Sequence, residues 1–197
     1  MSSNEAALQR LLCEIRACRV CARHLPLGPR PVLRARAGAR LLIIGQAPGT
    51  RVHASGIPWD DRSGERLRQW LGVDAETFYD DRRIAIMPMG FCFPGIDPRG
   101  GDNPPRPECA PLWHDRVLEH LSGLELVLLI GAYAQKRYLG SRRQASMTAT
   151  VAAWRDHLPG RMPLPHPSWR NTAWLKRHPW FESELVPELR RRVADLV

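Results

Sequence analysis

The chain has 197 residues, enough for one domain with a sizeable core, and a formal net charge of +9. No stretch approaches the roughly 20 apolar residues of a membrane span, and the polar N-terminus does not look like a signal peptide. We therefore expect a cytoplasmic protein that does not bind membranes. The excess of lysine and arginine favours a polyanionic partner. Seven tryptophans add surfaces on which exposed bases can stack.

The N-terminal part of the chain predicts a helix, an irregular connection and a strand. Apolar residues recur at helical spacing over residues 5–17. A C-x-x-C pair follows, and then a basic, proline-containing connection over residues 22–40. The uninterrupted apolar run at residues 41–44 predicts a strand that is covered on both faces. Residues 50–62 are expected to form a long loop.

The next segment predicts a helix and a second strand. A helix over residues 65–71 has Ser63 as its predicted N-cap and ends at Gly72. Residues 84–87 are the second predicted strand, and a connection rich in glycine and proline follows over residues 88–111. This connection holds two of the five cysteines.

The C-terminal half repeats the alternation of strands and helices. Helices are predicted over residues 112–121 and 132–139, with a buried strand at residues 126–130 between them. Further helical patterns occupy residues 148–156, 172–176 and 181–196. Such alternation indicates a three-layer α/β/α sandwich with a central, mostly parallel four-stranded sheet. We expect a single domain over residues 1–197.

Three loops should meet at the carboxyl edge of this sheet, where open α/β sheets bind ligands. The turn at residues 45–49 follows the first strand, and residues 88–92 follow the second. The apolar run at residues 162–165 leads into His166, which stands between two prolines. Proline restricts its own φ and the residue before it, so His166 is presented on a stiff loop.

Two of these loops carry a family resemblance. Gly45-Gln46-Ala47-Pro48-Gly49 and His166-Pro167-Ser168 resemble the first and last motifs of the uracil-DNA glycosylase superfamily, most closely its iron–sulfur branch. The resemblance runs from Cys18 to the terminal helix. It implies a monomeric DNA repair enzyme that hydrolyses the N-glycosidic bond of uracil, and of other deaminated bases as further candidates, in single- or double-stranded DNA.

The last motif implies roles for a run of neighbouring residues. His166 would donate a ring N–H to the carbonyl oxygen of the leaving base, for which a neutral ring suffices. Ser168 would hold a flanking phosphate. Trp169, Arg170 and Asn171 would form the wedge that fills the gap left by a flipped nucleotide.

The first motif departs from relatives that carry an acidic residue in this loop: some superfamily members use an aspartate there to orient water, and the iron–sulfur branch often has glutamate in place of Gln46. Gln46 would face the pocket, with Ala47, Pro48 and Gly49 beside the base, and the glycine permits close approach. Because neither Gln46 nor Ala47 is charged, the group that positions water must lie elsewhere, unless backbone groups do so. The candidates are His53, Asp60 and Asp61. A carboxylate at Asp61 is also favoured by the start of the following helix.

The middle of the chain offers groups that could bind the base. Gly56-Ile57-Pro58-Trp59 resembles the segment whose aromatic ring stacks on uracil. Relatives in the iron–sulfur branch often place an asparagine four residues before the cysteine at position 92, where this chain has Pro88. Backbone groups or another side chain would then read the polar edge of uracil. Phe91, in the same segment, is a further candidate for binding the base.

Four cysteines occur in the order seen in the iron–sulfur branch: Cys18, Cys21, Cys92 and Cys109. Four thiolates suit a [4Fe–4S] cluster or a tetrahedral zinc ion, and their spacing does not separate the two. The resemblance favours the cluster. Cys13 lies on the first predicted helix, where we expect it to be buried.

Two other functions compete with the enzyme. A non-catalytic protein that binds damaged or uracil-containing DNA would keep the fold, and the missing acid of the first motif favours it. A protein that is stabilised by a structural zinc ion and binds single-stranded nucleic acid would explain the charge and the tryptophans, but not the two end motifs.

Overall fold

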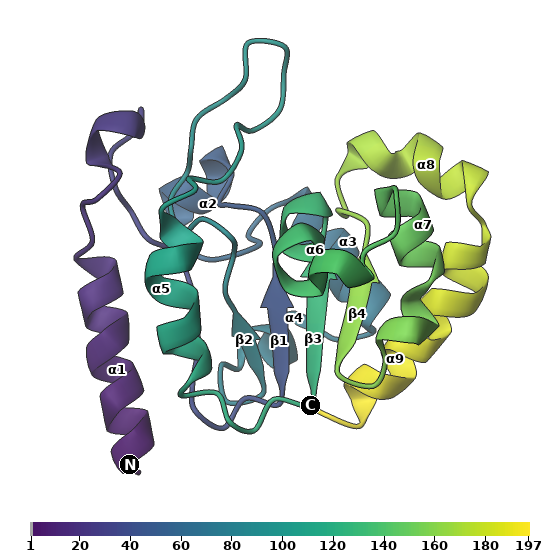
Figure 1. The fold of residues 1–197 in the computed structure, drawn as a ribbon, viewed down its shortest axis with the longest axis horizontal. Coiled ribbons are helices and arrows are strands. Elements are labelled where there is room, and N and C mark those ends of the chain that lie inside the picture. The colour runs from purple at the N-terminus through teal and green to yellow at the C-terminus, as the bar shows by residue number, and fades with distance from the viewer. Residues whose placement is uncertain (1) are drawn as a thin grey trace.

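The computed structural model describes residues 2–197 and has a four-stranded sheet at its centre (Figure 1). Its strands are β1 (Leu41–Ile44), β2 (Ile84–Ile86), β3 (Leu126–Ile130) and β4 (Arg161–Leu164). They stand in the order β2-β1-β3-β4, and each neighbouring pair is parallel. The predicted parallel sheet is confirmed. The strand order reverses between β1 and β3, and open sheets bind ligands at such a point.

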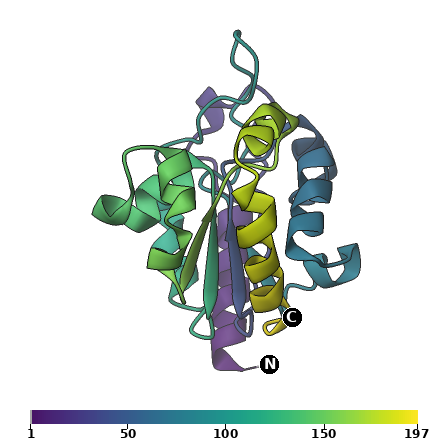
Figure 2. The ribbon, with the colours of Figure 1, turned by 90° about the vertical axis from the view of Figure 1, so that its right-hand side faces the viewer.

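Helices cover both faces of the sheet (Figure 2). They are α1 (Ser3–Arg16), α2 (Thr50–Ser55), α3 (Arg62–Leu71), α4 (Ala75–Tyr79), α5 (Cys109–Leu118), α6 (Ala132–Leu139), α7 (Met147–Ala152), α8 (Thr172–Arg177) and α9 (Val186–Ala194). Short 3₁₀ turns lie at η1 (Ala22–His24), η2 (Gly140–Arg142), η3 (Trp154–His157) and η4 (Trp169–Asn171), and η5 (Phe181–Leu185) is a π-helical turn.

Alternate residues of the strands build two separate cores. Leu41 and Ile43 pack with residues of α3, α4 and α9 on one face. Leu42 and Ile44 pack with α1, α5 and α6 on the other face. Because successive residues of a strand point to opposite faces, a fully apolar strand needs such a layer on each side. The predicted α/β/α sandwich is therefore confirmed.

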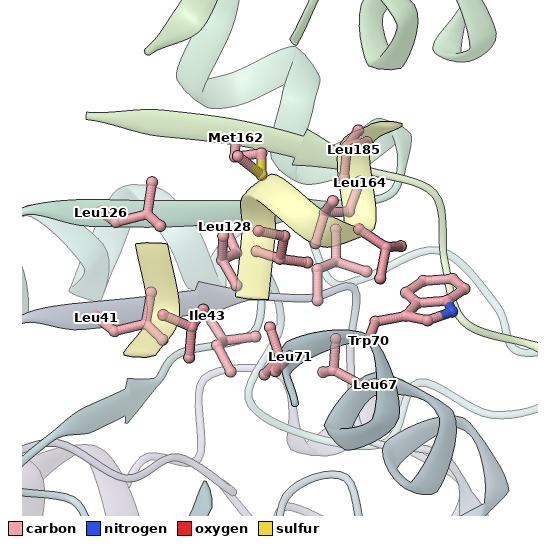
Figure 3. Close-up of a cluster of buried hydrophobic side chains, with 14 of the residues drawn as sticks. Leu41, Ile43, Leu67, Trp70, Leu71, Leu126, Leu128, Met162, Leu164 and Leu185 are labelled. Carbon is pink, nitrogen blue, oxygen red and sulfur yellow. The ribbon is translucent and has the colours of Figure 1, made fainter. Parts of the chain in front are cut away.

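The first of these cores fixes α3 against the sheet. Figure 3 shows Leu67, Trp70 and Leu71 of α3 beside the strand side chains, with Met162 and Leu164 of β4 in the same cluster. Leu67 is fully buried, and truncating such a leucine costs about 2–5 kcal/mol. The N-terminus of α3 is thereby held in place relative to the carboxyl ends of the strands.

Several predicted elements are found where the patterns place them, and others are corrected. The strands at residues 41–44 and 126–130 and the helix at residues 132–139 have the predicted bounds. The predicted loop at residues 50–62 instead contains α2. The N-cap of α3 is Asp61 rather than Ser63: Asp61 accepts a hydrogen bond from the backbone N–H of Gly64.

The N-terminal helix also differs from expectation in one residue. Ser2 caps α1 by accepting from the backbone N–H of Glu5, and the predicted apolar face is buried. Cys13, which we expected to be buried, is exposed on the opposite face. Within residues 2–197, no helix combines the length and the apolar character that crossing a bilayer requires.

Candidate active site at the carboxyl edge of the sheet

The loops at the carboxyl edge of the sheet enclose a cavity of about 740 Å³. Its wall comes mainly from residues within 45–52, 58–63, 100–102 and 166–171, together with Pro88. The predicted site residues that line it are Gln46, Ala47, Pro48, Gly49, Trp59, Asp61, His166, Ser168, Trp169, Arg170 and Asn171. The expected meeting of the loops is thus observed, and the volume is within the usual range for a small-molecule or nucleobase site.

His166 has a defined hydrogen-bonding state. Its Nδ1 accepts from the backbone N–H of Ser168 at 3.2 Å, so this nitrogen carries no hydrogen. The neutral ring then carries its hydrogen on Nε2, which has no hydrogen-bond partner among residues 2–197. Burial lowers the pKa of His166, although the nearby charge of Asp61 opposes the shift. At pH 7 the ring is therefore neutral and its Nε2–H is free for a ligand.

The loop that carries His166 is fastened from both sides. The Asn171 side-chain amide donates to the carbonyl of His166 at 2.7 Å, and Arg66 of α3 donates to the carbonyl of Ser168 at 3.2 Å. The Ser168 hydroxyl oxygen accepts from the backbone N–H of Arg170 and caps η4. Asn171, which we predicted as part of a wedge, therefore positions the histidine loop in this structure.

Trp59 is held beside His166 in an uncommon backbone conformation. Its φ is +59°, a left-handed value that is rare outside glycine. The indole and the His166 ring lie 5.5 Å apart between centroids, tilted by 36°. Glycines make room on both sides: a Cβ on Gly45 would lie 2.7 Å from the indole, and one on Gly64 would overlap the Trp59 carbonyl. The local backbone is thus adapted to this one position of the ring.

Gln46 connects the first motif to a hairpin later in the chain, which spans residues 95–103 and contains the antiparallel bridge between Ile96 and Asp102. Its carbonyl accepts from the backbone N–H of Gly90 at 3.0 Å, which extends the pairing of β1 with β2 into the loop. Its side-chain amide donates to the carbonyl of Asn103 at 3.2 Å. The backbone N–H groups of Gln46 and Ala47 have no acceptor among residues 2–197. These two donors belong to cavity-lining residues, where a carbonyl of a bound base could accept from them.

Two carboxylates, Asp61 and Asp102, face the cavity. One carboxylate oxygen of Asp61 caps α3 by accepting a hydrogen bond from the backbone N–H of Gly64 at 2.8 Å. Asp102 was absent from the sequence-based candidates, since it lies in a glycine- and proline-rich connection without a recognisable motif. Only the folded hairpin brings it over the first motif, where a Cβ on Gly49 would lie 3.4 Å from its Oδ2.

Asp60 does not line the cavity, and two further predicted site residues, His53 and Phe91, point away from it. The formation of α2 turns His53 inward, where its Nδ1 is buried without a partner among residues 2–197 and its ring lies 6.0 Å from Phe93. Phe91 is 2% exposed and stacks on the ring of His114 at 5.5 Å in the core. Both predictions relied on residue type and proximity in sequence, which do not determine the direction of a side chain.

A buried histidine that contacts Pro88, a residue of the cavity wall, was also absent from the sequence-based candidates. His114 is fully buried, and its Nε2 lies 3.1 Å from the carbonyl of Pro88. Because a carbonyl can only accept, Nε2 is the donor and Nδ1 accepts from the hydroxyl of Tyr138 at 2.6 Å. Burial lowers the pKa of His114 to about 4, which agrees with a neutral ring. The pair fixes the backbone at Pro88, where the cavity wall is formed.

The rim of the cavity carries positive charge and an exposed indole. Arg51, Arg62 and Arg170 line the cavity, and such side chains bind phosphates. Trp169 is 70% exposed, and the guanidinium of Arg170 lies 5.5 Å from the centre of its ring. Both side chains line the cavity, and their role as a wedge in DNA stays a prediction.

The four predicted ligand cysteines lie together at a different place. Cys18, Cys21, Cys92 and Cys109 line a second, smaller cavity between α1, α5 and the loop after β2, and all are free thiols. Burial, with a contribution from the neighbouring thiols, raises the pKa of Cys92 to about 11 and that of Cys109 to about 12. Within residues 2–197 no three side chains of suitable type are arranged as a finished metal site. A bound metal therefore stays a prediction.

Comparison with known proteins decides the family. The family model described as Uracil DNA glycosylase superfamily matches residues 34–190, which is most of the chain and includes every residue that lines the larger cavity except Val32. The chain belongs to the uracil DNA glycosylase superfamily. This confirms the superfamily that the two end motifs predicted, and it agrees with DNA as the polyanion that the basic composition favours.

A solved structure that the chain matches comes from Methanosarcina acetivorans. It is the solution NMR structure of a candidate uracil DNA glycosylase, 16% identical to this chain, with a TM-score of 0.45. The match covers 82% of this chain and 98% of the other. Similarity at this level carries no information about activity.

Proposed function

We propose that this superfamily member is a uracil-DNA glycosylase, which hydrolyses the bond between N1 of uracil and C1′ of deoxyribose. The observation that carries the proposal is the arrangement of Trp59, Gln46 and His166 around one cavity, with the Nε2–H of a neutral His166 free. An aromatic surface, backbone donors and a preorganised N–H donor are the parts that a departing uracil anion needs.

In this reaction the uracil nucleotide leaves the stack and enters the cavity, because its glycosidic bond is out of reach within a duplex. Trp59 provides a face for the base, and the N–H groups of Gln46 and Ala47 donate to its carbonyl oxygens. As the C1′–N1 bond breaks, negative charge develops on the base and positive charge on the sugar. The His166 Nε2–H donates to the carbonyl oxygen where that negative charge gathers. One such donor commonly contributes about 3–4 kcal/mol.

The binding of the DNA backbone is assigned to the rim. Arg51, Arg62 and Arg170 contact phosphates, and Trp169 fills the space that the flipped nucleotide leaves. Phosphate contacts supply most of the affinity of DNA-binding proteins and make it salt-dependent. In this proposal the rim binds DNA of any sequence, whereas the cavity selects the base.

We further propose that the four-cysteine cavity binds a [4Fe–4S] cluster, with zinc as the alternative. The donor set fits, since four thiols from three separate segments line one small cavity and the backbone N–H of Phe91 points to Cys109 Sγ at 3.4 Å. None of the four cysteines lines the larger cavity. A group bound there would tie α1 and α5 to the loop after β2 and act on stability.

The test uses labelled oligonucleotides with one uracil, either single-stranded or paired with guanine or adenine. Matched oligonucleotides with thymine or hypoxanthine at the same place probe selection of the base. We expect alkali-labile sites at uracil and none at thymine. Tight binding of the uracil strands without any cleavage would contradict the enzyme and leave the non-catalytic DNA-binding protein.

A further inference from the structure

A hairpin over residues 95–103 projects from the sheet edge between β2 and α5, as the teal loop at the top of Figure 1 and again in Figure 2. Ile96 and Asp102 pair in an antiparallel bridge, and the backbone N–H of Asp97 donates to the carbonyl of Gly101 at 2.8 Å. Gly101 has a φ of +101°, which suits the tip of a tight turn. The hairpin is therefore an ordered turn, and its residues Gly100, Gly101 and Asp102 line the cavity.

Both motif loops of the active site hold this hairpin. Gln46 donates to the carbonyl of Asn103, and the Asn103 side chain donates to the carbonyl of Pro94 at 3.2 Å. On the opposite side, the guanidinium of Arg170 packs directly against Gly101, so that a Cβ there would collide with it. The hairpin thus bridges the first motif and the last motif over the cavity.

These contacts place Asp102 where a water molecule could be held. Its carboxylate is exposed to the cavity and has no hydrogen-bond partner or ion pair among residues 2–197. Its Oδ2 lies beside Gly49, where a Cβ would be in van der Waals contact with it at 3.4 Å. Asp61, the other carboxylate of the cavity, is already engaged as the cap of α3.

The charges around Asp102 oppose one another. Desolvation by the cavity walls raises its pKa, the charge of Asp61 raises it further, and Arg170 lowers it. A carboxylate with a raised pKa is a better proton acceptor than an ordinary aspartate.

We propose that Asp102 is the carboxylate that orients and deprotonates the attacking water in uracil excision. The inference rests on the proposed function. In the step, the water oxygen bonds to C1′ while the C1′–N1 bond breaks and its electron pair goes to N1. One proton of the water passes to Asp102, and from there to solvent, and the uracil anion faces the Nε2–H of His166. The hairpin thereby supplies the carboxylate that the first motif lacks.

The experiment compares Asp102→Asn with Asp97→Asn, the same substitution in the same hairpin outside the cavity. Single-turnover cleavage of uracil-containing DNA should fall about 100-fold or more for Asp102→Asn, the usual scale for a lost general base. The Asp97→Asn rate, the DNA affinity and the melting temperatures of both variants should stay near those of the parent. The decline of the parental rate at acid pH should disappear in Asp102→Asn.

A third variant, Asp61→Asn, separates the two carboxylates. Asparagine also caps helices well, so this change removes the charge and keeps the cap. If Asp102→Asn cleaves at the parental rate, or loses affinity and melting temperature along with activity, the assignment of Asp102 is wrong. The same holds if only Asp61→Asn loses the rate. A parent protein that never cleaves overturns the proposed function itself, and the role of Asp102 with it.

Discussion

The glycine at position 64 offers a test of how the site is built. Gly64 lies in the first turn of α3, and a Cβ there would fall well inside the 3.0 Å that real Cβ atoms keep from the Trp59 carbonyl. Helix propensity alone predicts that Gly64→Ala stabilises the protein by about 1 kcal/mol. The contact with Trp59 predicts the opposite sign.

The size of the effect follows from the displacement that the new Cβ demands. The Trp59 carbonyl would have to move by more than about 1 Å, in a residue already in a left-handed conformation. Overpacking of this kind costs about 1–3 kcal/mol. A misplacement of about 1 Å near reacting groups can reduce a rate by about 100-fold. We therefore expect Gly64→Ala to melt several degrees lower and to cleave uracil-containing DNA about 100-fold more slowly.

The matched control is Gly160→Ala, where a Cβ would meet no atom within 4 Å. Thermal unfolding and single-turnover cleavage should be measured for both variants. The control should keep the parental rate and lose no stability. If Gly64→Ala equals the control in melting temperature and rate, the indole does not depend on this glycine, and our account of how Trp59 is positioned is wrong.

Three further results are expected. Replacing the exposed Trp169 by alanine should reduce cleavage of duplex DNA far more than cleavage of single strands, because only the duplex must be unstacked; equal losses would mean that this residue supports the loop. Anaerobically purified protein should be brown, and Cys109→Ala should lose colour and stability together, whereas colourless protein with one equivalent of zinc would replace the cluster by zinc. His114 should titrate near pH 4 by NMR. The free energy of unfolding should then fall as the pH drops from 6.5 towards 4, because in this range His114 binds a proton in the unfolded chain and not in the folded chain. An ordinary pKa near 6.5 would contradict its buried hydrogen bonds.

Local patterns predicted those parts of the fold that depend on local information. The strands β1 and β3 are short apolar runs bounded by polar residues and glycines, and α6 ends at Gly140, so their bounds follow from the sequence. The helix α2 was missed because six residues without a capping side chain leave little periodicity to detect. Asp61 and Ser63 are both acceptable N-caps, and only packing decides between them.

The candidate site was predictable to the extent that its residues belong to short motifs. Gln46, Trp59 and His166 are brought together because their loops follow parallel strands, which end at the same edge. Asp102 reaches the cavity through a hairpin whose position depends on contacts with Gln46 and Arg170, far apart in sequence. The inward turn of His53 likewise depends on the fold rather than on its neighbours in the chain.

The most direct test of the account is the single-turnover rate of His166→Ala, measured beside its equilibrium affinity for the same uracil-containing DNA at one salt concentration. A donor that acts on charge developing in the transition state contributes to the rate and little to binding of the ground state. We predict a rate about 100- to 1000-fold below that of the parent, the scale of one lost preorganised donor, with affinity nearly unchanged. Cleavage by His166→Ala at the parental rate would contradict the assignment of the active site.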